Sequence, residues 1–84
     1  MKRESTEYKT RDLTEAACLL TLRHKLVRLD VDPDNSQRLW FVFEDPHGDC
    51  KDVSVKFWSR KLLVDPREFG LRLRELKDRI HSGR

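Results

Sequence analysis

The spacing of apolar residues changes several times along the chain, and each change marks an expected element. The first regular stretch repeats apolar side chains at i, i+3, i+4 and i+7, the period of one helix face: Leu13, Ala16, Ala17 and Leu20. Just before it, Asp12 stands three residues ahead of Glu15, which is the spacing of a capping box. The pattern predicts a helix of about eleven residues that begins at Asp12 and ends near Arg23.

From residue 25 the period becomes two, which indicates strands. Val27, Leu29 and Val31 share one side of this stretch. A dense turn cluster then leads into residues 38–44, which are apolar on both sides and therefore typical of a central, covered strand. The pattern predicts a β-hairpin of residues 25–32 and 38–44.

Residues 50–60 fit two interpretations. Their apolar side chains alternate as in a strand, but Cys50, Val53 and Phe57 also form a helical stripe. The charged residues between them, and Asp49 in the position of a cap, favour the helix.

The last element is predicted most clearly. Asp65 is an expected N-cap, Pro66 stands at the first helical position, and Glu68 completes a second capping box. An apolar stripe at i, i+4, i+7 and i+11 follows: Phe69, Leu73, Leu76 and Ile80. Short strands are expected at residues 8–10 and 62–64.

These elements predict an α+β fold, in which one antiparallel hairpin with short extra edge strands packs against about three helices. Residues 8–82 form this single domain, and residues 1–7 are expected to be a disordered tail. The apolar stripes of residues 13–20 and 69–80 are expected to pack on the hairpin, where Val27, Leu29, Phe41 and Phe43 offer apolar surface. The expected core consists of Leu20, Leu29, Phe41, Phe43, Phe57, Phe69, Leu73 and Leu76.

Composition narrows the functional classes. The chain has 84 residues, 37% hydrophobic and 39% charged, which leaves little room for a closed active-site cavity. No apolar run approaches the roughly 20 residues that cross a bilayer, and no signal peptide precedes the domain, so a cytoplasmic protein without a membrane partner is expected. In that compartment Cys18 and Cys50 are expected to be free thiols.

Neither catalysis nor a cofactor is predicted. The chain lacks a glycine-rich phosphate loop and a serine nucleophile elbow, and its histidines stand among charged residues. Two Cys and His pairs supply four chemically sensible zinc ligands: Cys18 with His24, and His47 with Cys50. Neither pair has the spacing of a zinc knuckle, so we expect no metal site and no enzyme.

Charge is segregated along the chain. Residues 1–29 carry +3, residues 30–50 carry −5 and residues 51–84 carry +5. The candidate phosphate contacts are of two kinds: cations without a nearby acid in sequence, and cations outside the expected i, i+4 ion pairs of the last helix. They are Arg23, Lys25, Lys56, Arg60, Lys61, Arg67 and Lys77. The expected ion pairs are Glu68–Arg72, Arg74–Asp78 and Glu75–Arg79. The tryptophans are expected in the core rather than at a base-stacking surface.

Several motifs resemble a small, free-standing domain family of unknown function found in bacterial, archaeal and phage genomes. The resemblance runs from about residue 8 to residue 80 and rests on Tyr8-Lys9-Thr10-x-Asp12-Leu13, Phe41-Val42-Phe43-Glu44-Asp45 and Val64-Asp65-Pro66-Arg67-Glu68-Phe69. It implies a helix, a β-hairpin and two further helices, in a mobile-element setting. The sequence departs from the family at Arg23, where a glycine is expected before the turn into the hairpin.

Two functions remain for a module of this kind. The first is a small accessory or regulatory protein of a phage or mobile element that binds nucleic acid through backbone phosphates. The alternative is a protein-binding module that inhibits or adapts a host complex, with Asp32 and Asp34 at the hairpin tip meeting a basic partner. A homodimer is left open.

Overall fold

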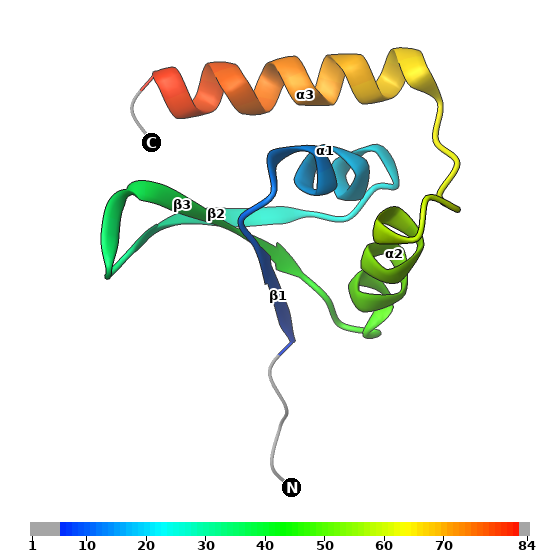
Figure 1. Ribbon diagram of the computed structural model, residues 1–84, viewed down its shortest axis with the longest axis horizontal. Helices are drawn as coiled ribbons and strands as arrows, with labels where there is room; N and C mark the ends of the chain where they lie inside the picture. Colours follow the sequence, from blue (N-terminus) through cyan, green and yellow to red (C-terminus); the bar gives the residue numbers. More distant parts are fainter. Residues whose placement is uncertain (1–5, 83–84) are drawn as a thin grey trace, which may run out of the picture.

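The computed structural model describes residues 6–82, which form an α+β domain of three helices and a three-stranded antiparallel sheet. The elements follow in the order β1 (Glu7–Thr10), α1 (Leu13–Thr21), β2 (Leu26–Asp32), β3 (Asn35–Glu44), α2 (Asp49–Trp58) and α3 (Pro66–His81). Figure 1 shows α1 between the sheet and α3, with α2 beside them. No helix among these residues is long and apolar enough to cross a membrane.

The strand that is apolar on both sides is the central one, as predicted. The order in the sheet is β1-β3-β2, so the predicted edge strand at residues 8–10 is also confirmed. The strand β1 begins at Glu7, which lies opposite Glu44, so this residue of the expected tail belongs to the sheet. Residues 1–5 of that tail lie outside the described residues.

A β-bulge at Val27 changes which face β2 presents to the core. Leu26 lies opposite Phe43 and Leu29 lies opposite Phe41, although the spacing on β2 is three and that on β3 is two. The extra residue, Val27, is therefore turned out and is 41% exposed. The expectation that Val27 offers core surface is wrong, because strict alternation does not anticipate a bulge.

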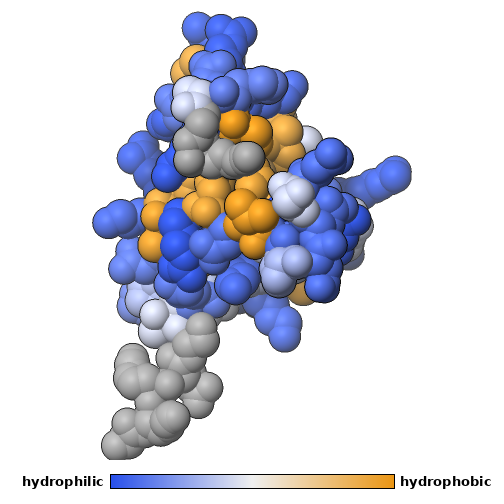
Figure 2. All heavy atoms as spheres, turned by 90° about the vertical axis from the view of Figure 1, so that its left-hand side faces the viewer, coloured by the Kyte–Doolittle hydropathy of each residue, from blue (hydrophilic) through white to orange (hydrophobic). Residues whose placement is uncertain are grey.

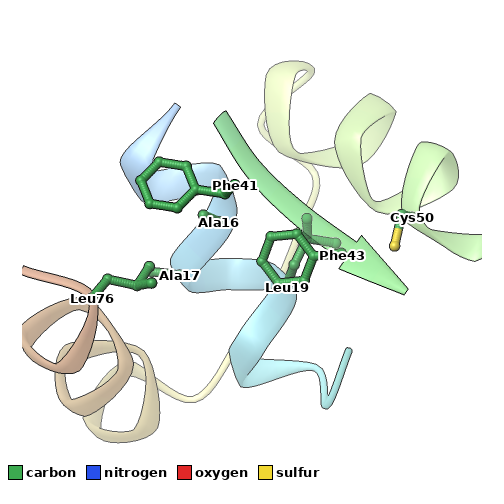
Figure 3. Packing of buried hydrophobic residues seen from close by; sticks show 7 residues of the cluster. All are labelled: Ala16, Ala17, Leu19, Phe41, Phe43, Cys50 and Leu76. Atoms are coloured by element: carbon green, nitrogen blue, oxygen red, sulfur yellow. The ribbon is translucent and has the colours of Figure 1, made fainter. Parts of the chain in front are cut away.

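Residues 15–19 of helix α1 are all buried, so the middle of the helix is covered on every side, and small side chains make this packing feasible. Ala16 and Ala17 are fully buried, so their short side chains let the helix approach the sheet on one side and α3 on the other. In Figure 3 the ring of Phe41 lies beside Ala16, and Leu76 of α3 points towards Ala17. Of the expected core, Phe41, Phe43 and Leu76 are buried, and four further residues are partly buried and pack against them: Leu20, Leu29, Phe69 and Leu73. Phe57 was expected there too, but it lies outside this cluster and packs against Trp58.

A buried carboxylate joins three elements beneath this core. Glu15 is 2% exposed, and its carboxylate accepts hydrogen bonds from the Tyr8 hydroxyl at 2.6 Å and the Thr10 hydroxyl at 3.0 Å. It also accepts one from the indole Nε1 of Trp58 at 3.2 Å. Asp12 does cap α1, by accepting from the Glu15 backbone N–H at 2.8 Å, but the Glu15 side chain does not return the bond. The predicted capping box is therefore only half formed.

The stretch that fitted both helix and strand is a helix, α2, which confirms the favoured interpretation. The strand expected at residues 62–64 is absent, since residues 61–65 form an irregular linker in which Leu63 is 90% exposed. Asp65 caps α3 as predicted, through a hydrogen bond from the backbone N–H of Arg67 at 3.1 Å. The Glu68 side chain instead forms an ion pair with Arg72.

The hairpin extends beyond the helices that cover the sheet (Figure 1). At this end the core-side residue Val31 lies opposite Leu39 but is 49% exposed. Figure 2, which faces this side of the molecule, shows apolar surface framed by hydrophilic side chains. The sheet is therefore fully covered only where α1 crosses it.

We predict that Phe41→Ala lowers the free energy of unfolding by about 3–5 kcal/mol, because it leaves a cavity between β3 and α1. Val31→Ala is the matched control: it also truncates a core-side strand residue, but at an exposed position, so a change of about 0.5 kcal/mol is expected. Urea unfolding followed by circular dichroism measures both. Equal stabilities of the two variants would show that the core is misplaced.

We also predict an unusual titration of Tyr8, the only tyrosine of the chain. Burial, and the hydrogen bond to the Glu15 carboxylate, raise the pKa of its phenol to about 12. The folded protein therefore keeps this proton at pH values where the unfolded chain, with a pKa near 10, has lost it. Stability is fully present below pH 10 and declines as the pH rises from about 10 to about 12.

Near-ultraviolet absorbance measures this ionisation directly, with the urea-unfolded chain as the reference. A midpoint near 10 in the folded protein would contradict the buried Tyr8–Glu15 hydrogen bond.

Candidate nucleic-acid interface

Two of the predicted phosphate contacts, Arg23 and Arg60, have a left-handed backbone. Their φ angles are 73° and 64°, a region that favours glycine because a Cβ atom meets the following carbonyl there. The cost for a non-glycine residue is roughly 1–2 kcal/mol. The turn in which a glycine was expected at residue 23 therefore does form, with an arginine in its place.

Each arginine directly follows the C-cap residue of a helix, and both belong to the same hydrogen-bonded motif. After α1, the backbone N–H of Arg23 donates to Leu20 at 2.9 Å and that of His24 to Leu19 at 3.0 Å. After α2, Arg60 donates to Phe57 at 3.1 Å, and Lys61 donates to Lys56 at 2.8 Å. These bonds satisfy the last carbonyl groups of each helix and require the left-handed residue.

The two basic clusters lie at opposite ends of α2. The Cys50 Sγ atom, in the first turn of α2, is 3.5 Å from His24 Nδ1, next to Arg23. Trp58, the last residue of α2, reaches Glu15 near the beginning of α1. The length of a ten-residue helix, about 15 Å, separates the Arg23 cluster from the Arg60 cluster.

Acids from the β3–α2 connection surround the first cluster. A hollow of about 220 Å³ is lined by Arg23 and Lys25 together with three carboxylates: Glu44, Asp45 and Asp49. The expectation that no acid lies near this cluster is therefore wrong. The sequence could not show this, because the carboxylates come from a segment about twenty residues further along the chain.

The second cluster is free. Arg60 and Lys61 are exposed, as is Lys56 on the preceding turn, and none of the three forms an ion pair with any residue from 6 to 82. An exposed cation without an internal partner keeps its full charge for a ligand. The α2 end of the molecule therefore offers the more available positive charge.

Helix α3 also carries free cations that were expected to form ion pairs. Arg72 binds both Glu68 and Glu75, the latter at 2.9 Å, so the predicted Glu68–Arg72 pair is confirmed. The pairs Arg74–Asp78 and Glu75–Arg79 do not form between these described residues. Arg74 and Arg79 were therefore missed as cations without an ion pair: Glu75 pairs with Arg72 instead of Arg79, and Asp78 pairs with no cation among residues 6–82.

Three of the free cations of α3 share a stripe. Arg67, Arg74 and Lys77 recur at i, i+7 and i+10, which places them within about one quarter of the helix circumference. Between the two arginines, Gly70 has no atom within 4 Å of the position that a Cβ would take. A hollow of about 290 Å³ results, lined by Pro66, Arg67, Gly70, Leu71 and Arg74.

Asp32, one of the two predicted partner contacts at the acidic hairpin tip, has a structural role. Asp32 is 8% exposed, and its Oδ1 atom accepts a hydrogen bond from the backbone N–H of Asp34 at 2.8 Å, which closes the turn. Arg11 approaches the other oxygen at 3.9 Å. Asp34 is exposed. The tip thus presents one free carboxylate rather than the predicted pair.

The four sulfur and nitrogen ligands considered for zinc do not assemble. Cys50 meets His24, but no group of three or more metal-binding side chains exists among residues 6–82. Both cysteines are free and buried, as predicted. Burial and the nearby Asp45 carboxylate raise the pKa of the Cys50 thiol to about 12, so it stays protonated at neutral pH and is a poor nucleophile.

No protein-family model, curated protein or solved structure matches this chain.

We predict that Arg60→Gly is more stable than Arg60→Ala by about 1 kcal/mol, because only glycine adopts the left-handed conformation without strain. Both substitutions remove the same charge near the end of α2, so the electrostatic effect cancels in the comparison. Ser59, with a φ of −91°, is the control, and there alanine is expected to be at least as stable as glycine. Urea midpoints measure all four variants, and an Arg60→Ala variant as stable as Arg60→Gly would contradict the strain.

Proposed function

We propose that this protein binds nucleic acid through backbone phosphates, as a small accessory or regulatory protein. The observation that carries the proposal is Arg60, an exposed arginine with a left-handed backbone and no ion pair within residues 6–82. A glycine would relieve the strain and leave the turn intact. Backbone strain of this kind is concentrated at functional sites, where the side chain is needed.

The helix dipole does not account for the arginine. A cation at the C-terminus of a helix gains only about 0.3–1 kcal/mol at an exposed position, which is less than the usual cost of the left-handed conformation. The guanidinium group supplies five N–H donors in a planar arrangement that matches a phosphate. Binding to an anion outside the chain therefore gives Arg60 a role that the fold does not.

Other cations without an ion pair agree with this role. Lys61 follows Arg60 directly, and Arg67, Arg74 and Lys77 form the stripe on α3. Contacts to phosphate need cationic side chains on a rigid surface, and they position a nucleic acid without reading its sequence. The acids around Arg23 and Lys25 make that end of α2 the weaker contributor.

We predict salt-dependent binding whose slope identifies the contacts. With about four phosphates neutralised, the slope of log K against log salt concentration is expected to be about −3.6 on duplex DNA. The double variant Arg60→Ala/Lys61→Ala should flatten the slope by nearly two units. Arg23→Ala/Lys25→Ala removes the same charge from the acid-lined hollow, so it should change the slope by less than about one unit.

Titrations of labelled duplex DNA, single-stranded DNA and RNA at low salt test the proposal. Absence of binding to all three near 50 mM salt, where phosphate contacts are strong, would overturn it. That result would favour the alternative, a protein-binding module. Equal slopes for the two double variants would retain nucleic-acid binding but move the contact away from the end of α2.

A further inference from the structure

Trp58 is an exposed aromatic ring with a fixed orientation. A tryptophan in so small a domain is expected in the core, but Trp58 is 62% exposed. Its indole N–H donates to the buried Glu15 carboxylate at 3.2 Å. Phe57 packs edge-on against it, with ring centroids 5.0 Å apart and an angle of 85° between the ring planes. An aromatic residue held from behind in this way leaves ring surface open to solvent.

A hollow of about 350 Å³ adjoins this ring. Its lining consists of Trp58 and three consecutive residues of the β1–α1 connection: Thr10, Arg11 and Asp12. The hollow is open to solvent, and its volume lies at the lower end of the range of small-ligand sites, about 300–1,000 Å³.

Two of the polar groups in the hollow are already occupied. The Thr10 hydroxyl donates to Glu15 at 3.0 Å and accepts from the Asp12 backbone N–H at 3.1 Å. The Oδ1 atom of Asp12 accepts from the Glu15 backbone N–H and from the Thr14 hydroxyl. The groups left to contact a ligand are therefore the indole of Trp58, the guanidinium of Arg11 and the second carboxylate oxygen of Asp12, which is a hydrogen-bond acceptor.

A second tryptophan positions Arg11. The guanidinium carbon of Arg11 lies over the ring of Trp40, 5.1 Å from its centroid, and Asp32 approaches the guanidinium at 3.9 Å. A guanidinium held over one aromatic ring can still present its edge, and its donors, to a second planar group. Arg11 lines the hollow, while its guanidinium contacts Trp40 and Asp32 outside the lining, so the hollow has an exposed aromatic face with a positioned planar cation at its edge.

We propose that this hollow binds one unpaired base of a single-stranded nucleic acid, stacked on Trp58 and contacted by Arg11. The inference rests on the proposed function, because Arg60 and Lys61 stand two and three residues after Trp58 and would hold the adjoining phosphates. Aromatic platforms beside a basic surface are the common means of binding single strands without sequence preference. A base inside a duplex is unavailable to the hollow unless it is first unstacked.

The test compares two single-stranded oligomers of equal length and equal phosphate number, one of thymidine nucleotides and one abasic. The base-bearing oligomer is expected to bind roughly tenfold more tightly, as the loss of a stacked base usually produces. Trp40→Phe leaves Trp58 as the only tryptophan, since the chain has two. In that variant the base-bearing oligomer should quench the fluorescence, and the abasic oligomer should not.

Arg11→Ala tests the site without touching the Trp58–Glu15 hydrogen bond. It should lower the ratio of the two affinities by about threefold, the size of a cation–π contact. Lys9→Ala removes a neighbouring cation that does not line the hollow, so it should leave the ratio unchanged.

The outcomes separate this inference from the proposed function. Equal, salt-dependent binding of both oligomers would overturn the stacking site and leave phosphate binding intact. Base-dependent binding that is insensitive to salt would support the site and overturn the phosphate contacts. Failure of both oligomers to bind would overturn both.

Discussion

The buried carboxylate of Glu15 is the interaction on which the arrangement of this domain depends. Removing an ionised group from water costs several kcal/mol unless hydrogen bonds replace its hydration. Here the replacements come from Tyr8 and Thr10 of β1 and from Trp58 of α2, while the residue itself belongs to α1. If any of these elements moved away, the carboxylate would lose a donor in the interior. One side chain thus fixes the relative positions of β1, α1 and α2.

Much of the architecture follows from local patterns. The apolar period of 3.6 in α3, the two-sided apolar run of β3 and the aspartate caps of α1 and α3 each have a physical cause within a few residues. The expectations are wrong where a segment distant in sequence determines the position of a side chain. Glu15 has the spacing of a capping residue, but the donors of β1 and α2 draw its side chain into the core. Val27 alternates correctly in sequence, yet the bulge turns it out.

In the candidate interface, too, local sequence predicts the surroundings of some residues correctly and misjudges those of others. Sequence neighbours identified Arg60 and Lys61, whose charge remains free because no acid approaches within the described part of the chain. The same reasoning failed for Arg23 and Lys25, which share a hollow with carboxylates from the β3–α2 connection. The role of Arg11 depends on Trp40 of β3 and Trp58 of α2, so it becomes visible only once the sheet and α2 are in place.

Two features that cost the fold stability lie near the end of α2. A small domain has only about 5–15 kcal/mol of stability, so a left-handed arginine and a largely exposed tryptophan are appreciable disadvantages. Arg60 and Trp58 are two residues apart, and the Glu15 carboxylate that orders the core also holds the Trp58 indole. The interaction that stabilises the domain therefore also presents an aromatic face beside a free arginine. A phosphate and its base are a ligand with the same two parts, an anion next to a planar ring, which is why these observations support one binding surface rather than two unrelated irregularities.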